Sequence, residues 1–252
     1  MNVTFNFEGK NFVVVGASSG IGKQCAIELA ESGANILAIG RNLERLQEVQ
    51  KHFPQKIFIA QLDVTTAKVE DWEKVFTDFI SNFDRLHGGI YTAGTWGLTP
   101  LNGFDKEFAH KIFNTNFWGA VDFLQIATEK KFTHWMSACV VMSSFAANYP
   151  NKNLFAYSAA KAAIQAAVES FAKEIIKNGH RINSVAPALV QTEMLNSDFA
   201  AMAAEMIPKH LLGICEAGDI AEMILFLLSD SAKKITGKNF SVDGGYLSGA
   251  LI

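Results

Sequence analysis

The feature that most constrains the fold is a glycine-rich turn directly after the first apolar segment. Residues 11–15 (NFVVV) are rich in β-branched side chains, and residues 23–30 follow a helical pattern. This succession predicts a strand, a tight turn and a helix. Gly16, Gly20 and Gly22 have the spacing GxxxGxG, not the GxGxxG of the general dinucleotide fingerprint. Such glycines let the backbone approach a phosphate, which the start of the helix also attracts. The turn is a candidate pyrophosphate site, with an ordinary strand–helix connection as the alternative.

Strand-like and helical segments alternate along the whole chain, without an evident repeat, low-complexity segment or linker. The alternation predicts an α/β fold of the Rossmann type, a doubly wound seven-stranded parallel sheet with right-handed crossovers and helices on both faces. We expect a single domain over residues 1–252, which is long enough to form a sizeable core. The expected strands are Asn11–Val15, Asn35–Ile39, Lys56–Leu62, Gly89–Ala93, Ala138–Met142, Arg181–Val185 and Asn239–Val242.

Composition argues against several other classes of protein. A formal net charge of −3 gives no support to nucleic-acid or anionic-membrane binding. No segment is long and apolar enough to span a bilayer, and the first residues lack the basic start of a signal peptide. Cys25, Cys139 and Cys215 are scattered and odd in number, so we expect reduced thiols in a cytoplasmic protein. The histidines are dispersed and neither CxxC nor HExxH occurs, so no metal site is expected.

The end of the second expected strand indicates which dinucleotide would bind. NAD-binding proteins usually place an acidic residue about 20 residues beyond the glycines to hold the ribose 2′-hydroxyl. Here the strand ends at Gly40, and Arg41 and Asn42 follow. A guanidinium suits a 2′-phosphate by its charge and its forked donors, and Lys23 offers a second positive charge. We therefore predict NADP(H) rather than NAD(H), with a surface arginine at a helix start as the alternative.

Tyr157 and Lys161 lie four residues apart in a segment, Asn153–Asn178, that we expect to be one long helix. Residues at this spacing share a helical face, so the phenol and the ammonium can point into the same space. A free tyrosine ionises at about pH 10, and a close lysine cation lowers that pKa. The pair therefore predicts a general acid or base. Alone it is weak, because a Tyr and a Lys at helical spacing usually mark only an exposed face.

Taken together, these motifs resemble the short-chain dehydrogenase/reductase family, in its single-domain branch with the 3-oxoacyl-ACP reductases. The resemblance runs from residues 7–10 (FEGK) to residues 241–245 (SVDGG). It implies a catalytic tetrad made of an asparagine, a serine, a tyrosine and a lysine, namely Asn116, Ser144, Tyr157 and Lys161. It also implies a set of cofactor contacts along the chain: Gly16, Ser18, Ser19, Gly20, Ile21, Gly22, Arg41, Asn42, Asp63, Val64, Ala93, Gly94, Tyr157, Lys161, Pro187, Val190 and Thr192.

The resemblance implies reduction of a ketone or aldehyde to an alcohol by hydride transfer from NADP(H). Tyr157 would protonate the carbonyl oxygen, and Ser144 would hydrogen-bond it as negative charge develops. Lys161 would lower the pKa of Tyr157 and hold the nicotinamide ribose. Asn116 would hold a water that connects Lys161 to solvent.

Two positions depart from the family pattern. The family's Asn-Asn-Ala-Gly is Tyr-Thr-Ala-Gly at residues 91–94, which leaves open whether the strand-bridging contact of the asparagines is made. Its Pro-Gly after the sixth strand is Pro187-Ala188 here, a change that can tighten the turn beside the nicotinamide. Neither change removes a group that takes part in the chemistry.

Three other functions share some of these motifs. A hydrolase with Ser144 as nucleophile would need the flanking glycines of a nucleophile elbow, which are absent. An epimerase or dehydratase would need a larger C-terminal substrate region. A non-catalytic NADP-binding sensor or scaffold is the alternative from another class, because fold alone proves no activity. Such proteins tend to lose a member of the tetrad, and this chain keeps all four.

The substrate is the least constrained part. Residues 193–212 are expected to form a mobile lid rich in methionine and other apolar residues, which suits a largely apolar carbonyl compound. Packing of the lid against the core explains the same side chains. A 3-oxoacyl thioester is the first candidate, and an acidic acyl carrier protein would need a basic patch to dock. The candidate lysines are Lys130, Lys131, Lys173 and Lys177, and a free ketone is the alternative.

Small residues on the long helix predict self-association. Ala162, Ala163, Ala166 and Ala167 would allow two helices to approach closely. In similar proteins this helix packs against its symmetry mate, and the last strand with the tail Gly244–Ile252 forms a second interface. Two such contacts give a homotetramer and one gives a homodimer. The alternative is that the alanines pack only against the sheet.

Overall fold

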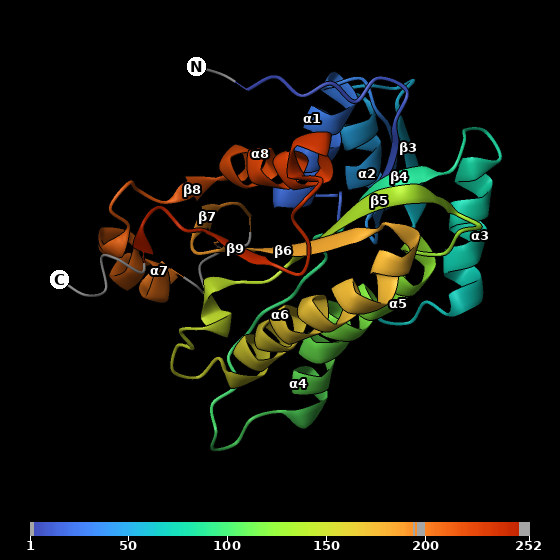
Figure 1. Ribbon diagram of the computed structural model, residues 1–252. Coiled ribbons are helices and arrows are strands. Elements are labelled where there is room, and N and C mark those ends of the chain that lie inside the picture. Colours follow the sequence, from blue (N-terminus) through green and yellow to red (C-terminus); the bar gives the residue numbers. More distant parts are fainter. Residues whose placement is uncertain (1–2, 194, 196–199, 247–252) are drawn as a thin grey trace.

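The expected strands form one parallel sheet in the computed structural model, which describes residues 3–193, 195 and 200–246 (Figure 1). Every pair of neighbours in this seven-stranded sheet is parallel. From edge to edge the strands are β3 (Ile57–Gln61), β2 (Asn35–Gly40), β1 (Asn11–Val15), β4 (Leu86–Tyr91), β5 (Thr133–Met142), β6 (Arg181–Pro187) and β9 (Asn239–Val242). The winding direction reverses between β1 and β4, the point where such sheets bind ligands at the carboxyl ends of their strands.

Helices cover both faces of the sheet, which confirms the predicted fold class (Figure 1). One face carries α1 (Gly20–Glu31), α2 (Leu43–Gln50) and α8 (Ala217–Leu228), and the other carries α3 (Val69–Ile80), α4 (Lys106–Phe113), α5 (Gly119–Ala127) and α6 (Phe155–Ile175). Since both faces are covered, all residues of β1 are buried, which explains its continuous apolar run.

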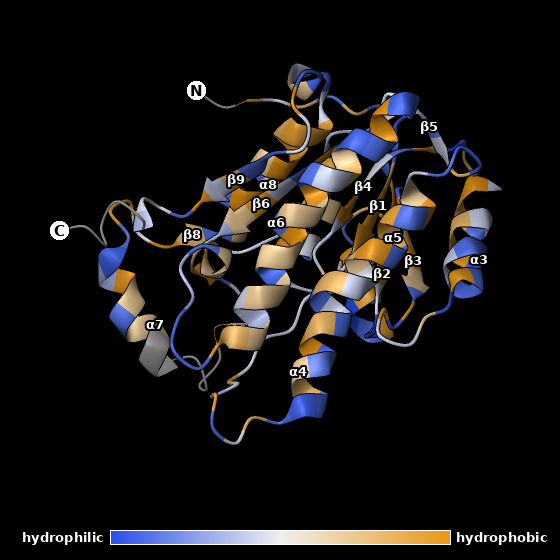
Figure 2. Ribbon diagram, turned by 60° about the horizontal axis from the view of Figure 1, so that its bottom comes forward, coloured by the Kyte–Doolittle hydropathy of each residue, from blue (hydrophilic) through white to orange (hydrophobic). Residues whose placement is uncertain are grey.

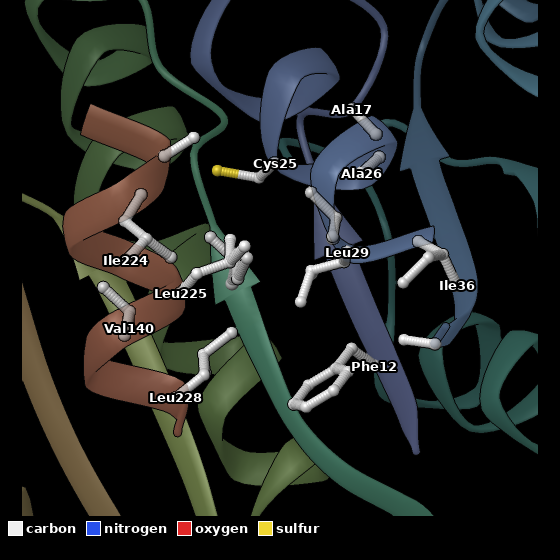
Figure 3. Packing of buried hydrophobic residues seen from close by; sticks show 14 of the residues in the cluster. Phe12, Ala17, Cys25, Ala26, Leu29, Ile36, Val140, Ile224, Leu225 and Leu228 are labelled. Carbon is white, nitrogen blue, oxygen red and sulfur yellow. The ribbon is translucent and has the colours of Figure 1, made fainter. Parts of the chain in front are cut away.

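The first core layer lies between the sheet and the pair α1 and α8. Figure 3 shows Leu225 and Leu228 of α8 pointing toward the space that Leu29 of α1 and Phe12 of β1 also fill. All four side chains are buried. Cys25, on the same helix as Leu29, is a buried free thiol, and burial raises its pKa. These contacts hold α1 in place, and with it the glycine turn that starts the helix.

The second core layer, on the opposite face, is rich in aromatic rings. Trp72 of α3 lies 6.2 Å from Phe123 of α5 between ring centroids, and Phe76 lies 5.7 Å from Phe132 in an edge-on arrangement. Gly89 of β4 makes this packing possible, because a Cβ there would lie 2.6 Å from Val13 and 2.8 Å from Phe123. Glycine therefore occurs inside a strand where an aromatic ring approaches the backbone.

Five strands have bounds other than those predicted, and the largest differences are in β4 and β5. β4 begins earlier than expected and ends at Tyr91, and β5 begins at Thr133 instead of Ala138. Leu86 pairs with Thr133, and the register then shifts before Gly88 pairs with Ala138. The first half of β5 is irregular and partly exposed, so it lacks the continuous apolar run on which the prediction depended.

A short second sheet was not predicted. β7 (Val190–Gln191) pairs with β8 (Cys215–Glu216), and α7 (Ala200–Met206) lies in the chain between them. Both strands have only two residues, too few to show a periodicity in the sequence. Of the predicted lid, residues 194 and 196–199 lie outside the described residues. Its mobility stays a prediction.

The predicted long helix is confirmed as α6, followed by a 3₁₀ turn, Ile176–Asn178. Figure 2 looks onto α4, α5 and α6, and the ribbon of α6 is mostly pale to orange on this side. Ala166 is exposed and the other three alanines are half-buried, so they do not pack only against the sheet. The tail 247–252 lies outside the described residues, and the oligomeric state stays a prediction. No helix among the described residues is long and apolar enough to cross a membrane.

Candidate active site

A cleft of about 670 Å³ opens at the carboxyl ends of the strands. Every member of the predicted tetrad and every predicted cofactor contact lines it. These residues are distant in sequence, and they meet because the segments that follow β1 to β6 all begin at the carboxyl ends of the parallel strands.

The glycine turn is closely packed backbone. Gly16 has a φ of 87°, and a Cβ on it would lie 2.5 Å from the backbone nitrogen of Ala93. A Cβ on Gly22 would lie 2.3 Å from the carbonyl oxygen of Gly16. At the start of α1 the N-cap Ser19 makes no side-chain capping bond, and the first turn has no acidic residue. The N–H groups there are therefore left for an anion at this end of the cleft.

Two arginines lie at the far end of the cleft, beyond β2. Arg41 and Arg45 both line it and both are exposed, and no salt bridge of the described residues involves either one. Asn42 caps α2 by accepting from the backbone of Arg45 at 2.9 Å, which sets the start of that helix. Lys23, the second cation expected from the sequence, is not among the described residues that line the cleft. Arg45 takes its place, because the first turn of α2 brings it to the same end as Arg41.

Ser144, Tyr157 and Lys161 lie close together inside the cleft. Tyr157 hydrogen-bonds with Ser144, which follows the end of β5. Lys161, one turn along α6, has its Nζ 5.8 Å from the centre of the Tyr157 ring. That Nζ is buried and donates to the carbonyl oxygen of Met142 at 2.9 Å. The shared helical face that the sequence predicts is thus present.

Burial shifts the pKa values of both groups. It raises the pKa of Tyr157, and the hydrogen bond with Ser144 opposes this rise only in part. It lowers the pKa of Lys161 to about 7, and no carboxylate of the described residues forms an ion pair with this lysine. A lysine with this pKa is partly protonated at neutral pH. That Lys161 lowers the pKa of the phenol stays a prediction.

Asn116 lies in a π-helical segment, Asn114–Trp118, beside Lys161. Its Nδ2 donates to the carbonyl oxygens of Thr95 at 2.6 Å and Ile112 at 2.8 Å. Its Oδ1 is buried and has no hydrogen-bond partner. A Cβ on Gly94 would lie 2.9 Å from this oxygen and 3.8 Å from Nζ of Lys161. The absence of that Cβ leaves a polar space between an unpaired acceptor and a lysine, a setting that suits a bridging water.

Both departures from the family pattern are accommodated. Thr92 donates from its hydroxyl to the carbonyl oxygen of Val15 at 2.8 Å, so a side chain does bridge the ends of β1 and β4. Ala188 lines the cleft after β6 and does not have a positive φ, so its position does not require glycine.

The predicted basic patch for a carrier protein is not beside the cleft. Lys130 and Lys131 directly precede β5, and Lys173 and Lys177 lie at the end of α6 just before β6 begins. All four therefore lie at the amino ends of the strands, on the side of the sheet opposite to the cleft. Lys131 forms an ion pair with Glu73 at 3.8 Å, as expected for a solvated surface.

Comparison with known proteins agrees with this geometry. Residues 16–247 match the family model described as enoyl-(acyl carrier protein) reductase. The crystal structure of a short-chain dehydrogenase/reductase, a glucose/ribitol dehydrogenase from Brucella melitensis, superposes with a TM-score of 0.90 at 24% identity and covers 97% of this chain and 99% of its own. The chain belongs to the short-chain dehydrogenase/reductase family.

Curated relatives in this family match over nearly their full lengths. L-xylulose reductase of Caenorhabditis elegans is 28% identical, with 98% of this chain and 99% of the relative covered. NAD-dependent glycerol dehydrogenase of Listeria innocua is 29% identical, with 96% and 95% covered. The 3-oxoacyl-[acyl-carrier-protein] reductase of Thermotoga maritima is 28% identical, with 94% and 98% covered. Proteins of this family are oxidoreductases that bind a nicotinamide cofactor and act on carbonyl or alcohol groups.

The residues of this short-chain dehydrogenase/reductase fit a nicotinamide cofactor. At the glycine turn and the uncapped start of α1, the absence of side chains on the glycines lets a phosphate approach the backbone. The unpaired Oδ1 of Asn116 lies at the other end of the cleft. Part of the substrate half was missed by the sequence analysis, because residues such as Thr95 and Leu154 belong to no motif. Among the described residues that line this half beyond the tetrad, Glu193 is the only charged one.

The buried ammonium of Lys161 predicts a pH-dependent cost to stability. The folded protein binds this proton less tightly than the unfolded chain, whose lysine pKa is the ordinary 10.5. The cost is therefore complete below about pH 7 and decreases as the pH rises toward 10.5. We expect Lys161→Met to raise the free energy of unfolding most at pH 6, and its advantage to shrink by up to about 1.4 kcal/mol per pH unit above pH 7.

Urea unfolding between pH 6 and 9, without added nucleotide, measures this difference. Lys173→Met, on the exposed side of the same helix, is the control and should show no such trend. An advantage of Lys161→Met that stays constant across this range would contradict the argument.

Proposed function

We propose that this protein is an NADP(H)-dependent reductase that converts a ketone or aldehyde to an alcohol, with Tyr157 as the proton donor. The observation that carries the proposal is the cluster inside the cleft, where Tyr157, Ser144 and the buried Lys161 meet the unpaired oxygen of Asn116. A sensor or scaffold would not need to keep a lysine buried without a carboxylate, which costs stability. That cost favours catalysis over the non-catalytic alternative.

The cleft offers a place for each part of the cofactor. The glycine turn and the start of α1 would hold the pyrophosphate, and Arg41 with Arg45 would hold the 2′-phosphate. Pro187, Val190 and Thr192, after β6, would lie beside the nicotinamide. When bound, the nicotinamide supplies the hydride that reduces the carbonyl carbon.

The protein's own groups would handle the proton. A raised pKa keeps Tyr157 protonated at neutral pH, so the phenol is available as an acid when negative charge grows on the substrate oxygen. Ser144 would donate to the same oxygen and fix its orientation. The protonated phenol is the form that the reduction requires.

Lys161 would return a proton to Tyr157 after each turnover. Its pKa of about 7 allows it to release and take up a proton near neutral pH. The space next to Gly94 would hold a water between Lys161 and Oδ1 of Asn116, and this water would link the lysine to solvent.

We propose a neutral, largely apolar carbonyl compound as the substrate, covered by the lid 193–212. The substrate half of the cleft has apolar side chains such as Phe145 and Leu189, and no lining cation beyond Lys161 among the described residues of that half. Since the candidate lysines lie at the opposite edge of the sheet, a free small molecule is favoured over a carrier-bound 3-oxoacyl thioester.

The first prediction concerns the cofactor. We expect NADPH to bind at least several-fold tighter than NADH, because each charge-assisted contact to the phosphate contributes about 1.5–3 kcal/mol. Arg41→Asp should reverse this preference by repelling the 2′-phosphate. Arg85→Asp makes the same change of charge on an exposed residue at the opposite edge of the sheet and should leave it unaltered. Fluorescence titration measures the affinity of each of the three proteins for both nucleotides, and equal affinities in the unaltered protein would remove the proposal.

The second prediction concerns the acid. Tyr157→Phe keeps the ring and removes the proton, so kcat should fall by about 100-fold or more while the Kd of NADPH changes by no more than about twofold. Tyr149→Phe removes the hydroxyl of an exposed tyrosine and serves as the control. Both constants come from a spectrophotometric assay of NADPH oxidation and a binding titration. A Tyr157→Phe protein with most of its reductase activity would show that another group is the acid.

The third prediction concerns the substrate. We expect a 3-oxoacyl carrier-protein thioester and its short soluble analogue to have similar kcat/KM at both low and high salt. A higher kcat/KM for the carrier-bound thioester, with an advantage that shrinks as salt screens the charges, would contradict this. It would instead support a carrier-bound substrate. An enoyl thioester, tested in the same assay, should not be reduced.

A further inference from the structure

A buried tyrosine, Tyr91, forms a hydrogen bond with the π-helical segment that carries Asn116. In this segment the backbone N–H of Gly119 donates to the carbonyl oxygen of Asn114, five residues earlier. Such turns occur mostly as single interruptions of α-helices and often at functional sites. Here the turn lies between α4 and α5, and its one tetrad member is Asn116.

Three backbone carbonyl oxygens in and beside this turn accept hydrogen bonds from side chains. Thr115 donates from its hydroxyl to the carbonyl oxygen of Lys111 at 2.9 Å, and Asn116 donates from Nδ2 to that of Ile112 at 2.8 Å. The third bond comes from outside the helix: the hydroxyl of Tyr91, the last residue of β4, donates to the carbonyl oxygen of Thr115 at 2.6 Å. That carbonyl belongs to the peptide group that joins Thr115 to Asn116.

We propose that Tyr91 is a positioning residue for Asn116, and that it acts through the peptide group between Thr115 and Asn116. The bond ties this peptide to the end of β4, just before the segment that passes Gly94. Asn116 is then fixed at its backbone by Tyr91 and at its amide by Thr95, both from the same stretch of chain. Its Oδ1 is left directed at the space that it shares with Lys161.

The site is built for a tyrosine hydroxyl. The Tyr91 side chain is 2% exposed, and burial raises its pKa well above the usual range, so the hydroxyl remains a donor. Gly119 leaves room for it, because a Cβ there would lie 2.4 Å from this oxygen. Without the hydroxyl the carbonyl of Thr115 would lose this buried hydrogen bond, and the turn could relax.

Tyr91→Phe tests the proposal, whose kinetic part rests on the proposed reductase function. We expect kcat to fall about tenfold while KM for NADPH and for the carbonyl compound changes by no more than about twofold. The solvent deuterium isotope effect on kcat should rise, because proton return through Lys161 becomes limiting. Thr133→Val is the matched control: it removes another buried hydroxyl that donates to a helical carbonyl, that of Ala127 at 2.8 Å, away from the cleft. It should change neither kcat nor the isotope effect.

Hydrogen exchange gives a readout that does not depend on activity. Amides of residues 114–120 should exchange faster in Tyr91→Phe and keep their rate in Thr133→Val. Gly119→Ala should reproduce the effect, because its Cβ displaces the hydroxyl, and the double variant should be no worse than Gly119→Ala alone.

The outcomes separate the two proposals. If the unaltered protein reduced no carbonyl compound, the proposed function would fall, while faster exchange in Tyr91→Phe alone would still support the anchoring. Unchanged exchange in Tyr91→Phe would overturn the anchoring. Faster exchange with an unchanged kcat and isotope effect in an active enzyme would overturn the positioning role.

Discussion

The active site depends on a lysine that the fold keeps buried, and no acid of the described residues forms an ion pair with it. Lys161 lies on α6 with its ammonium on the carbonyl oxygen of Met142, where β5 ends. This bond connects the catalytic helix to the end of β5. Desolvation brings the pKa of the lysine close to neutrality, which suits proton exchange far better than a fully solvated ammonium. The same desolvation raises the pKa of Tyr157 and keeps the phenol protonated at neutral pH.

Close backbone packing places the remaining parts around this lysine. Gly16 and Gly22 let the β1–α1 turn lie directly on the start of the segment after β4, and Thr92 fastens the two with a hydrogen bond to Val15. That segment continues to Gly94, whose missing side chain opens the space between Asn116 and Lys161. The cofactor cradle and the proposed proton path are therefore parts of one packed unit. A shift at either end would be transmitted through Thr92 and Gly94.

The sequence was sufficient for the sheet and for most residues of the cleft. β1 and β9 have the predicted bounds, because a buried strand in a parallel sheet is a continuous apolar run between polar ends. Features that depend on tertiary contact were missed or misplaced. The π-helical turn is too short to show a periodicity of apolar residues in the sequence. In the sequence Tyr91 is only a departure from the family motif, and its role requires knowledge of its hydrogen bond with Thr115. Lys23 and the four surface lysines were assigned by charge alone, and only the fold shows where each one lies relative to the cleft.

The contact between Tyr91 and Gly119 also restricts how this chain can change over time. The tyrosine is acceptable only while position 119 is glycine, because a methyl group at position 119 would occupy the place of the hydroxyl. A lineage could acquire alanine at position 119 without a clash only after the tyrosine had already been replaced. Once that had happened, restoring the tyrosine would require glycine to return first. The two positions, 28 residues apart in the chain, would therefore be inherited as a pair, and the order of substitutions would matter as much as their identity.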